Sequence, residues 1–121
     1  MRLLVLLPLF LAGCNLKGFE AEIQGRTPFA PPAVYLEWWH DTSTCANLSG
    51  SFEKLSFYLA DWITANRLVA RARWSEPHDI IIVRGYEADS KVVRHEMLHD
   101  LLRGDPNHTD GRWRSCDLSF G

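Results

Sequence analysis

The sequence predicts a single α+β domain in which a small antiparallel or mixed sheet packs on one main helix. Several short runs rich in β-branched and aromatic residues occupy the middle of the chain, and a segment with helical periodicity follows them. The chain has 121 residues, 46% of them hydrophobic, including five tryptophans. That is enough apolar material for one core and too little for two.

The first 13 residues are expected to be a signal peptide outside the fold. Arg2 gives a positive start, and residues 3–11 are apolar but too short to span a bilayer. Residues 11–14, Leu-Ala-Gly-Cys, resemble the lipobox of bacterial lipoproteins, in which the cysteine is lipidated. The resemblance implies a lipid-anchored cell-envelope protein, and Asn15 implies the outer membrane, facing the periplasm or the outside. The alternative is an ordinary secretory peptide in which Cys14 is incidental.

Residues 14–33 are expected to form the lipidated cysteine and a flexible tether. Glycine and proline are scattered through this stretch, and no apolar period is sustained. A flexible tether of this length spans on the order of 25 Å. It would lift the folded domain, residues 34–121, off the membrane surface.

Strands are expected in the first half of the folded domain. Residues 34–39 and 52–59 are rich in β-forming residues, and 67–74 alternate imperfectly, which fits a strand or a short helix. Turn-forming residues at 75–79 lead into 80–83, a β-branched run too short for a helix. An extended peptide could add along this last strand if it lies at a sheet edge.

Residues 90–104 are expected to form the main helix. Asp89 or Ser90 can cap its start, and Gly104 lies where a left-handed residue would end it. A hydrophobic residue recurs every four positions on one face, at Val93, Met97 and Leu101. This face can pack on the sheet while the opposite face carries other chemistry.

The same helix contains His95-Glu96-Met97-Leu98-His99, an H-E-x-x-H pattern. Histidines four positions apart share one helix face, so both can reach one metal ion at about 2 Å. Glu96 points about a quarter turn aside and is not a further ligand to that ion. The pattern resembles the active-site helix of the zincin metallopeptidases. The resemblance implies Zn²⁺, hydrolysis of a peptide bond by zinc-bound water, and Glu96 as the general base.

The third ligand is expected after the helix, and no glutamate follows the motif. The metzincin pattern H-E-x-x-H-x-x-G-x-x-H would place glycine at position 102 and a ligand at 105, where this chain has Leu102 and Asp105. No later methionine provides a Met-turn either, so the resemblance to metzincins is loose. We expect His108 to be the third ligand, brought back by the turn at 104–107, with Asp105 as the alternative.

Supporting residues for this site are expected nearby. Tyr86 or His78 could donate a hydrogen bond to the oxyanion of a transition state. Asp100 or Asp110 could orient a ligand histidine through its outer nitrogen.

The remaining cysteines, Cys45 and Cys116, form an even pair once Cys14 is assigned to lipid. An exported chain lies where disulfides persist, so we expect a Cys45–Cys116 bond. Closing a loop of this length would stabilise the fold by roughly 4 kcal/mol. Two metal-binding thiolates are the alternative, but the C-x-x-C spacing of such sites is absent.

The composition also restricts the partners. The formal net charge is −2, and no basic run is present, which argues against nucleic acid as a partner. The expected partners are a peptide or protein substrate, and the membrane through the lipid anchor. The alternative function is a non-catalytic zinc-binding envelope lipoprotein with a structural or protein-interaction role, and a metal-free lipoprotein is a third possibility.

Overall fold

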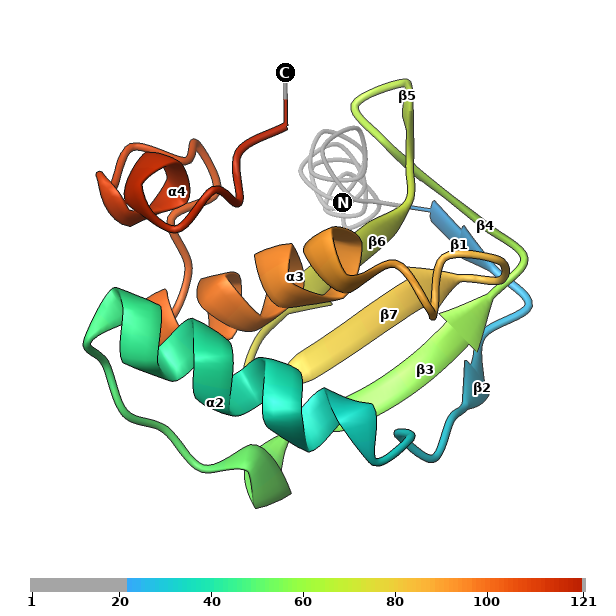
Figure 1. Ribbon diagram of the computed structural model, residues 1–121. Coiled ribbons are helices and arrows are strands. Elements are labelled where there is room, and N and C mark those ends of the chain that lie inside the picture. Colours follow the sequence, from blue (N-terminus) through green and yellow to red (C-terminus); the bar gives the residue numbers. More distant parts are fainter. Residues whose placement is uncertain (1–21, 121) are drawn as a thin grey trace, which may run out of the picture.

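The computed structural model describes residues 22–120, which form an α+β fold with two small sheets and three α-helices (Figure 1). The predicted class is therefore confirmed in this general form. The expected signal peptide and lipidated Cys14 lie outside the described residues. Within residues 22–120, no helix has the length and apolar character needed to cross a membrane.

The larger sheet is mixed and has the strand order β2-β3-β7-β6. Its strands are β2 (Thr27–Pro28), β3 (Ser56–Ala60), β6 (Ala72–Ser75) and β7 (Asp79–Val83). The β3–β7 pair is parallel and the other two pairs are antiparallel. The strand expected at 80–83 is confirmed as β7, but it lies inside the sheet. The edge strands are β2 and β6, and β7 is paired on both sides, so a peptide cannot add along β7.

The smaller sheet is antiparallel and has the order β1-β4-β5. Its strands are β1 (Glu22–Gln24), β4 (Trp62–Ala65) and β5 (Leu68–Ala70). The expectation of a flexible tether up to residue 33 is wrong for residues 22–28, because β1 and β2 pair with β4 and β3. Strands this short show no sustained period, and the side chain of Ile23 packs against a buried cluster beneath the sheet.

The first helix of the described chain, α2 (Val34–Ala46), replaces the strand expected at 34–39. Its buried residues follow helical spacing: Tyr35, Trp39, Thr42 and Ala46. The aromatic residues near the start of α2 favour a strand by propensity. The helical spacing of buried residues continues to Ala46, past the end of the expected strand, and the helix forms. The helix ends at Asn47, which has a left-handed φ of 56°.

Two further strand expectations are resolved by the structure. The expected strand 52–59 begins with a 3₁₀ turn (Phe52–Lys54) before β3. The stretch 67–74 is extended rather than helical, and it is divided into β5 and β6 at Arg71.

The helix expected at 90–104 is present as α3 (Ser90–Leu102), but it is not a single main helix, because α2 also has 13 residues. The Asp89 carboxylate caps it by accepting hydrogen bonds from the Lys91 and Val92 backbone N–H groups. Arg103, with φ 60°, takes the left-handed position expected for Gly104. The helix packs against α2 and against β6 and β7, as Figure 1 shows. Its apolar face is in the main core, as expected: Val93, Met97 and Leu101.

The Cys45–Cys116 disulfide is confirmed. It joins the end of α2 to the residue after α4 (Arg112–Ser115) and closes a separation of 71 residues. The C-terminal segment is thereby attached beside the end of α2, with Trp113 and Leu118 buried in the main core.

Candidate metal centre

Three histidine side chains converge beside α3. The Nε2 atom of His108 lies 3.1 Å from Nε2 of His95 and 3.1 Å from Nε2 of His99. Two ligands of a tetrahedral zinc ion with Zn–N bonds near 2.0 Å lie roughly 3.3 Å apart. Both distances from His108 therefore fit two ligands of a single ion, and one ligand atom from each of the three histidines lies within 4.8 Å of the others. The residue expected from the sequence as the third ligand, His108, is the one that the structure brings to the pair.

The outer nitrogens of two of these imidazoles are fixed by backbone carbonyls. His95 donates from Nδ1 to the Leu118 carbonyl at 2.6 Å, and His99 donates from Nδ1 to the Gly104 carbonyl at 2.8 Å. Carbonyl oxygens only accept, so in the neutral rings both protons are on Nδ1 and both Nε2 atoms carry lone pairs. If Nε2 of His108 carries a proton, that one N–H group cannot donate a full hydrogen bond to both the His95 and the His99 Nε2 atoms. One metal cation, in contrast, could accept the lone pairs of all three Nε2 atoms.

Burial keeps these rings neutral. His95 and His99 are almost fully buried. Burial lowers the pKa of His95 to about 4, with the neighbouring histidines adding to the shift and the Leu118 carbonyl opposing it. The pKa of His99 is also lowered, mainly by burial. His95 and His99 are therefore held in the unprotonated form that metal binding requires.

Asp105 organises the loop that presents His108. Its Oδ1 accepts hydrogen bonds from the N–H and Oγ1 of Thr109, and its Oδ2 accepts from the Asp110 N–H and from Nε1 of Trp113. These hydrogen bonds, led by the one from Asp110, hold the pKa of Asp105 well below its usual range. The alternative third ligand thus has a structural role, because both of its oxygens are used within the loop.

Trp113 is the common neighbour of the three imidazoles. Its ring centroid lies 4.5, 4.6 and 4.7 Å from those of His95, His99 and His108. Because its indole N–H is bonded to Asp105, Trp113 connects the loop to the histidines. No local pattern in the sequence signals the contact of Trp113 with the histidines.

Glu96 lies in the same cavity as the three histidines. This cavity, about 660 Å³ in volume, lies between β6 and the loop after α3 and is also lined by Arg73, Trp74 and Pro106. Burial raises the pKa of Glu96 to about 8, while the Arg73 charge and a hydrogen bond from the Trp74 backbone N–H oppose the rise. A buried carboxyl that titrates near neutral pH beside a metal-type cluster can exchange a proton in a reaction.

The expected oxyanion donors do not lie in this cavity. Neither Tyr86 nor His78 lines it, whereas Arg73 on β6 does. Arg73 was not singled out from the sequence, because one arginine in an alternating stretch gives no signal of its position. Its guanidinium group can donate hydrogen bonds, which is what the expected oxyanion donor would have to do.

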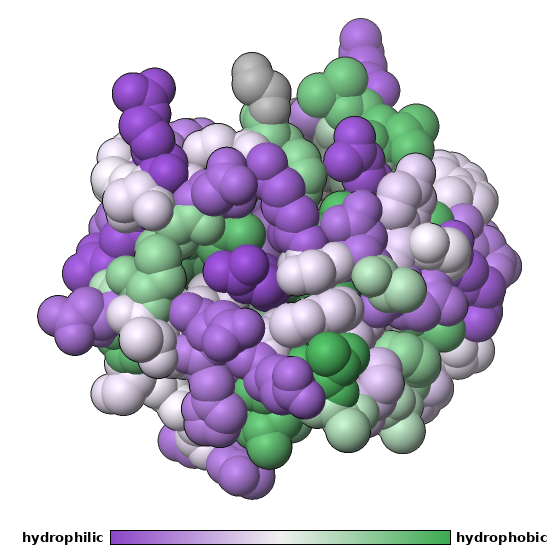
Figure 2. Space-filling model, viewed as in Figure 1, coloured by the Kyte–Doolittle hydropathy of each residue, from purple (hydrophilic) through white to green (hydrophobic). Residues whose placement is uncertain are grey.

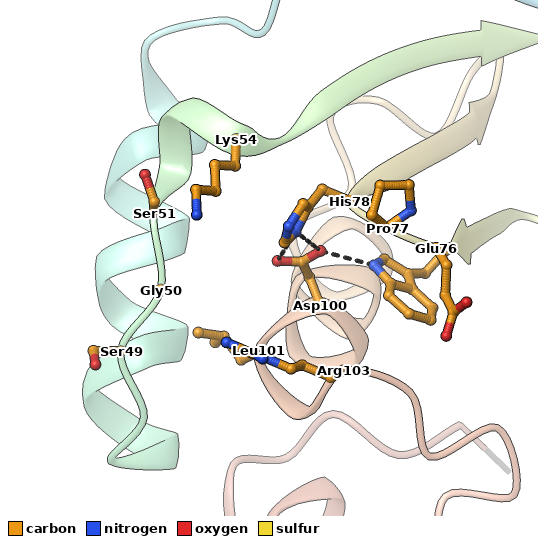
Figure 3. Close-up of a pocket in the computed structure, with 11 residues that line it drawn as sticks. Ser49, Gly50, Ser51, Lys54, Glu76, Pro77, His78, Asp100, Leu101 and Arg103 are labelled. Carbon is orange, nitrogen blue, oxygen red and sulfur yellow. Dashed lines mark hydrogen bonds and ion pairs between the residues drawn. The ribbon is translucent and has the colours of Figure 1, made fainter.

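The expected carboxylate partners of the ligand histidines are wrong, because backbone carbonyls occupy both outer nitrogens. Asp100 Oδ1 instead accepts from Trp74 Nε1 at 2.8 Å and pairs with Nδ1 of His78 at 3.0 Å, beside a neighbouring cavity (Figure 3). Trp74 stacks on His99 with a centroid distance of 6.4 Å, so Asp100 acts on the site only through this indole. Asp110 pairs with Arg112.

Comparisons with protein-family models, curated proteins and solved structures find no match to this chain. The fold and the site define an α+β chain with three histidines that could hold one metal ion.

Proposed function

We propose that this chain is a zinc-dependent peptidase of the zincin type, only loosely related to metzincins. The observation that carries the proposal is the convergence of three Nε2 atoms in a cavity that also contains Glu96. Three imidazoles, of which His95 and His99 are oriented from their outer nitrogens, suit zinc, and three protein ligands leave a position open, as catalytic sites require.

The residues around the centre would divide the chemistry. Zinc, when bound, supplies a Lewis acid that polarises a peptide carbonyl. Glu96 would take a proton from the attacking water and deliver it to the leaving amine. Arg73, which lines the same cavity, would stabilise the negative charge that develops on the carbonyl oxygen.

The edge position of β6 supports a peptide as the substrate. Residues 72–75 of this strand line the cavity that holds Glu96 and the histidines. In the described part of the sheet, β6 is paired on one side only, with β7. An extended substrate could form main-chain hydrogen bonds along the free side and place its scissile bond near the centre.

We also propose that Cys14 carries lipid and holds the enzyme at the cell envelope. The support for this is the Leu-Ala-Gly-Cys sequence after an apolar run. Asn15 points to the outer membrane as the destination. The enzyme would then reach only substrates close to that membrane.

The test combines metal content with peptide hydrolysis, using the wild type, Glu96→Gln and His108→Ala. His40→Ala is the matched control, because His40 is an exposed histidine on α2. We expect one zinc per chain in the wild type, Glu96→Gln and His40→Ala, and loss of zinc in His108→Ala. Hydrolysis of a peptide library should fall at least 100-fold in Glu96→Gln and remain unchanged in His40→Ala.

Two results would overturn the peptidase. If the wild type holds no zinc at micromolar concentration, the metal centre itself is wrong. If it holds zinc but the wild type and Glu96→Gln are equally inert toward peptides, the alternative of a non-catalytic zinc-binding lipoprotein replaces the peptidase.

A further inference from the structure

We propose that the tip of the β4–β5 hairpin docks on the anionic surface of the membrane that holds the lipid anchor. The inference rests on the proposed lipidation of Cys14 and is independent of the peptidase activity. The proposed partner of the hairpin tip is a lipid bilayer that contains acidic lipids.

The tip exposes two aliphatic side chains. Leu68 is 71% exposed and Val69 is 80% exposed, more than any other large hydrophobic residue in the described chain. They follow a tight turn at Asn66 and Arg67, both with positive φ, and Ala65 pairs directly with Leu68. The hairpin turn projects from the sheet. The side chains of Leu68 and Val69 would therefore become buried only by contact with another surface.

The charge around the tip favours acidic lipids. Residues 62–74 contain three arginines and no acidic residue, although the whole chain has a net charge of −2. The Arg71 guanidinium lies over the exposed rings of Tyr86, at 5.9 Å, and Phe120, at 5.3 Å. Aliphatic, aromatic and arginine side chains together are the usual composition of a membrane-interface contact.

The acidic groups near this surface are few. Glu22 pairs with Thr64 of β4, and Asp117 lies 4.0 Å from Lys91, whose ammonium is over the Phe120 ring. Glu87, next to Tyr86 in the chain, is a further carboxylate, and Asp61 at the base of the hairpin pairs with Arg84. The positive charge is therefore concentrated in the hairpin segment, which carries Arg67 and Arg71 and no acidic residue.

The anchored end of the chain enters the fold beside this tip. Glu22, the first described residue, pairs with Thr64, and Thr64 pairs with Val69 on its other side. With neighbouring strands about 4.8 Å apart, Glu22 lies roughly 10 Å from Val69. The eight peptide steps from Cys14 to Glu22 can span at most about 30 Å. A lipidated Cys14 would therefore hold the tip near the bilayer at a high effective concentration.

The location of the tip also relates it to the metal centre. In Figure 1 the β5 end of the hairpin and the C-terminal segment after α4 both lie at the top of the view. Figure 2, seen from the same side, shows hydrophobic residues next to hydrophilic ones at the top of the molecule. Val69 and Phe120 line a cavity of about 210 Å³ together with His95 and Glu96. Docking through the tip would therefore place the metal centre next to the membrane surface.

The experiment uses the lipidated full chain with an environment-sensitive fluorophore at Leu68→Cys. The other cysteines are blocked, since Cys45 and Cys116 are paired and Cys14 would carry lipid. His40→Cys, on an exposed position of α2, is the matched control. The two labelled chains are reconstituted in phosphatidylcholine vesicles with and without phosphatidylglycerol, and quenching by lipids with brominated acyl chains is measured.

We expect the label at position 68 to be quenched several-fold more than the label at position 40, and phosphatidylglycerol to increase the difference. Arg67→Asn, which removes one charge and suits the left-handed turn, should reduce the gain from phosphatidylglycerol. Equal quenching at positions 68 and 40 would overturn docking, as would mass spectrometry showing no acyl chain on Cys14. Zinc content and hydrolysis are measured separately, so a failed peptidase would not be mistaken for a failed docking surface.

Discussion

The ligand histidines owe their orientation to residues that lie outside the H-E-x-x-H motif. The Leu118 and Gly104 carbonyls fix His95 and His99, and Asp105 fixes the loop that presents His108. Partners of this kind commonly change metal affinity by 10-fold to 100-fold. Residues far from the motif in sequence are therefore expected to control how tightly the site binds zinc.

Trp113→Phe tests this dependence. The substitution keeps an aromatic ring beside the three histidines but removes the 2.7 Å hydrogen bond from the indole N–H to Asp105. We expect zinc affinity to fall about 10-fold, measured by competition with a chromogenic chelator. Trp62→Phe, on the other sheet, is the control and should bind as the wild type does. Equal affinity of Trp113→Phe and wild type would show that Asp105 holds the loop without the indole.

Glu96→Gln tests the burial of the carboxyl in the metal-free chain. Burial raises the pKa of Glu96 from 4.5 to about 8, so the folded state binds this proton more tightly than the unfolded state. The contribution of Glu96 to the unfolding free energy is therefore most favourable below pH 4.5 and is lost as the pH rises to about 8. Glu96→Gln has no such loss. We expect it to be more stable than wild type by a few kcal/mol at pH 8.

The measurement is urea unfolding with chelator present at several pH values between 4 and 8. At each pH the unfolding free energy of Glu96→Gln is compared with that of the wild type. All other titratable groups are the same in the two proteins, so their contributions cancel in the difference. A difference that stays constant with pH would show that the Glu96 carboxylate is already stabilised in the folded chain.

The sequence predicted the residues of the histidine cluster better than it predicted the neighbours of that cluster. Spacing on one helix places His95, Glu96 and His99 together without any knowledge of the rest of the fold, and a turn after the helix was enough to suggest His108. The roles of Asp105 and Trp113 depend on how residues 105–113 close into a loop. Nothing in the local sequence determines those contacts.

At the scale of elements, α3 was predictable because its signals agree, and α2 was not because its signals conflict. Asp89 caps α3 and its apolar residues recur at helical spacing. In α2, Tyr35, Trp38 and Trp39 favour a strand by propensity, while burial follows a helical period. Packing on α3 decides in favour of the helix, and that contact is between segments about 50 residues apart.

Asp89→Ala tests the start of α3. The carboxylate accepts from two backbone N–H groups, of Lys91 and Val92, that have no partner within the helix. We expect the substitution to lower the unfolding free energy by about 1 kcal/mol, measured by urea unfolding. Asp41→Ala, an exposed position within α2, should change it by less than 0.5 kcal/mol. Equal effects of the two substitutions would show that the cap contributes nothing.

At the scale of the whole molecule, the order of strands was beyond sequence reasoning. The sequence predicts a strand at 80–83, but only the pairing with β3 and β6 shows that β7 lies inside the sheet and that β6 is an edge strand. The same is true of β1 and β2, whose few residues become strands only because β4 and β3 lie beside them. Long-range pairing of this kind leaves little trace in any local window.

The disulfide links global stability to the metal centre. It closes a separation of 71 residues and attaches the segment that carries the Leu118 carbonyl, the partner of His95. Replacing both cysteines by serine, in the double variant Cys45→Ser/Cys116→Ser, should lower the unfolding free energy by about 4 kcal/mol when a chelator keeps the protein free of metal. It should also weaken zinc binding, because His95 would lose part of its orientation.

The two effects can be separated by measuring unfolding with and without zinc. Zinc at 100 times its dissociation constant stabilises a folded protein by about 2.7 kcal/mol, so the gain from a fixed zinc concentration reports affinity. We expect a smaller gain in the double variant than in the wild type. An equal gain would mean that the buried side chains of Trp113 and Leu118 hold the C-terminal segment by themselves, and that the disulfide acts on the unfolded chain alone.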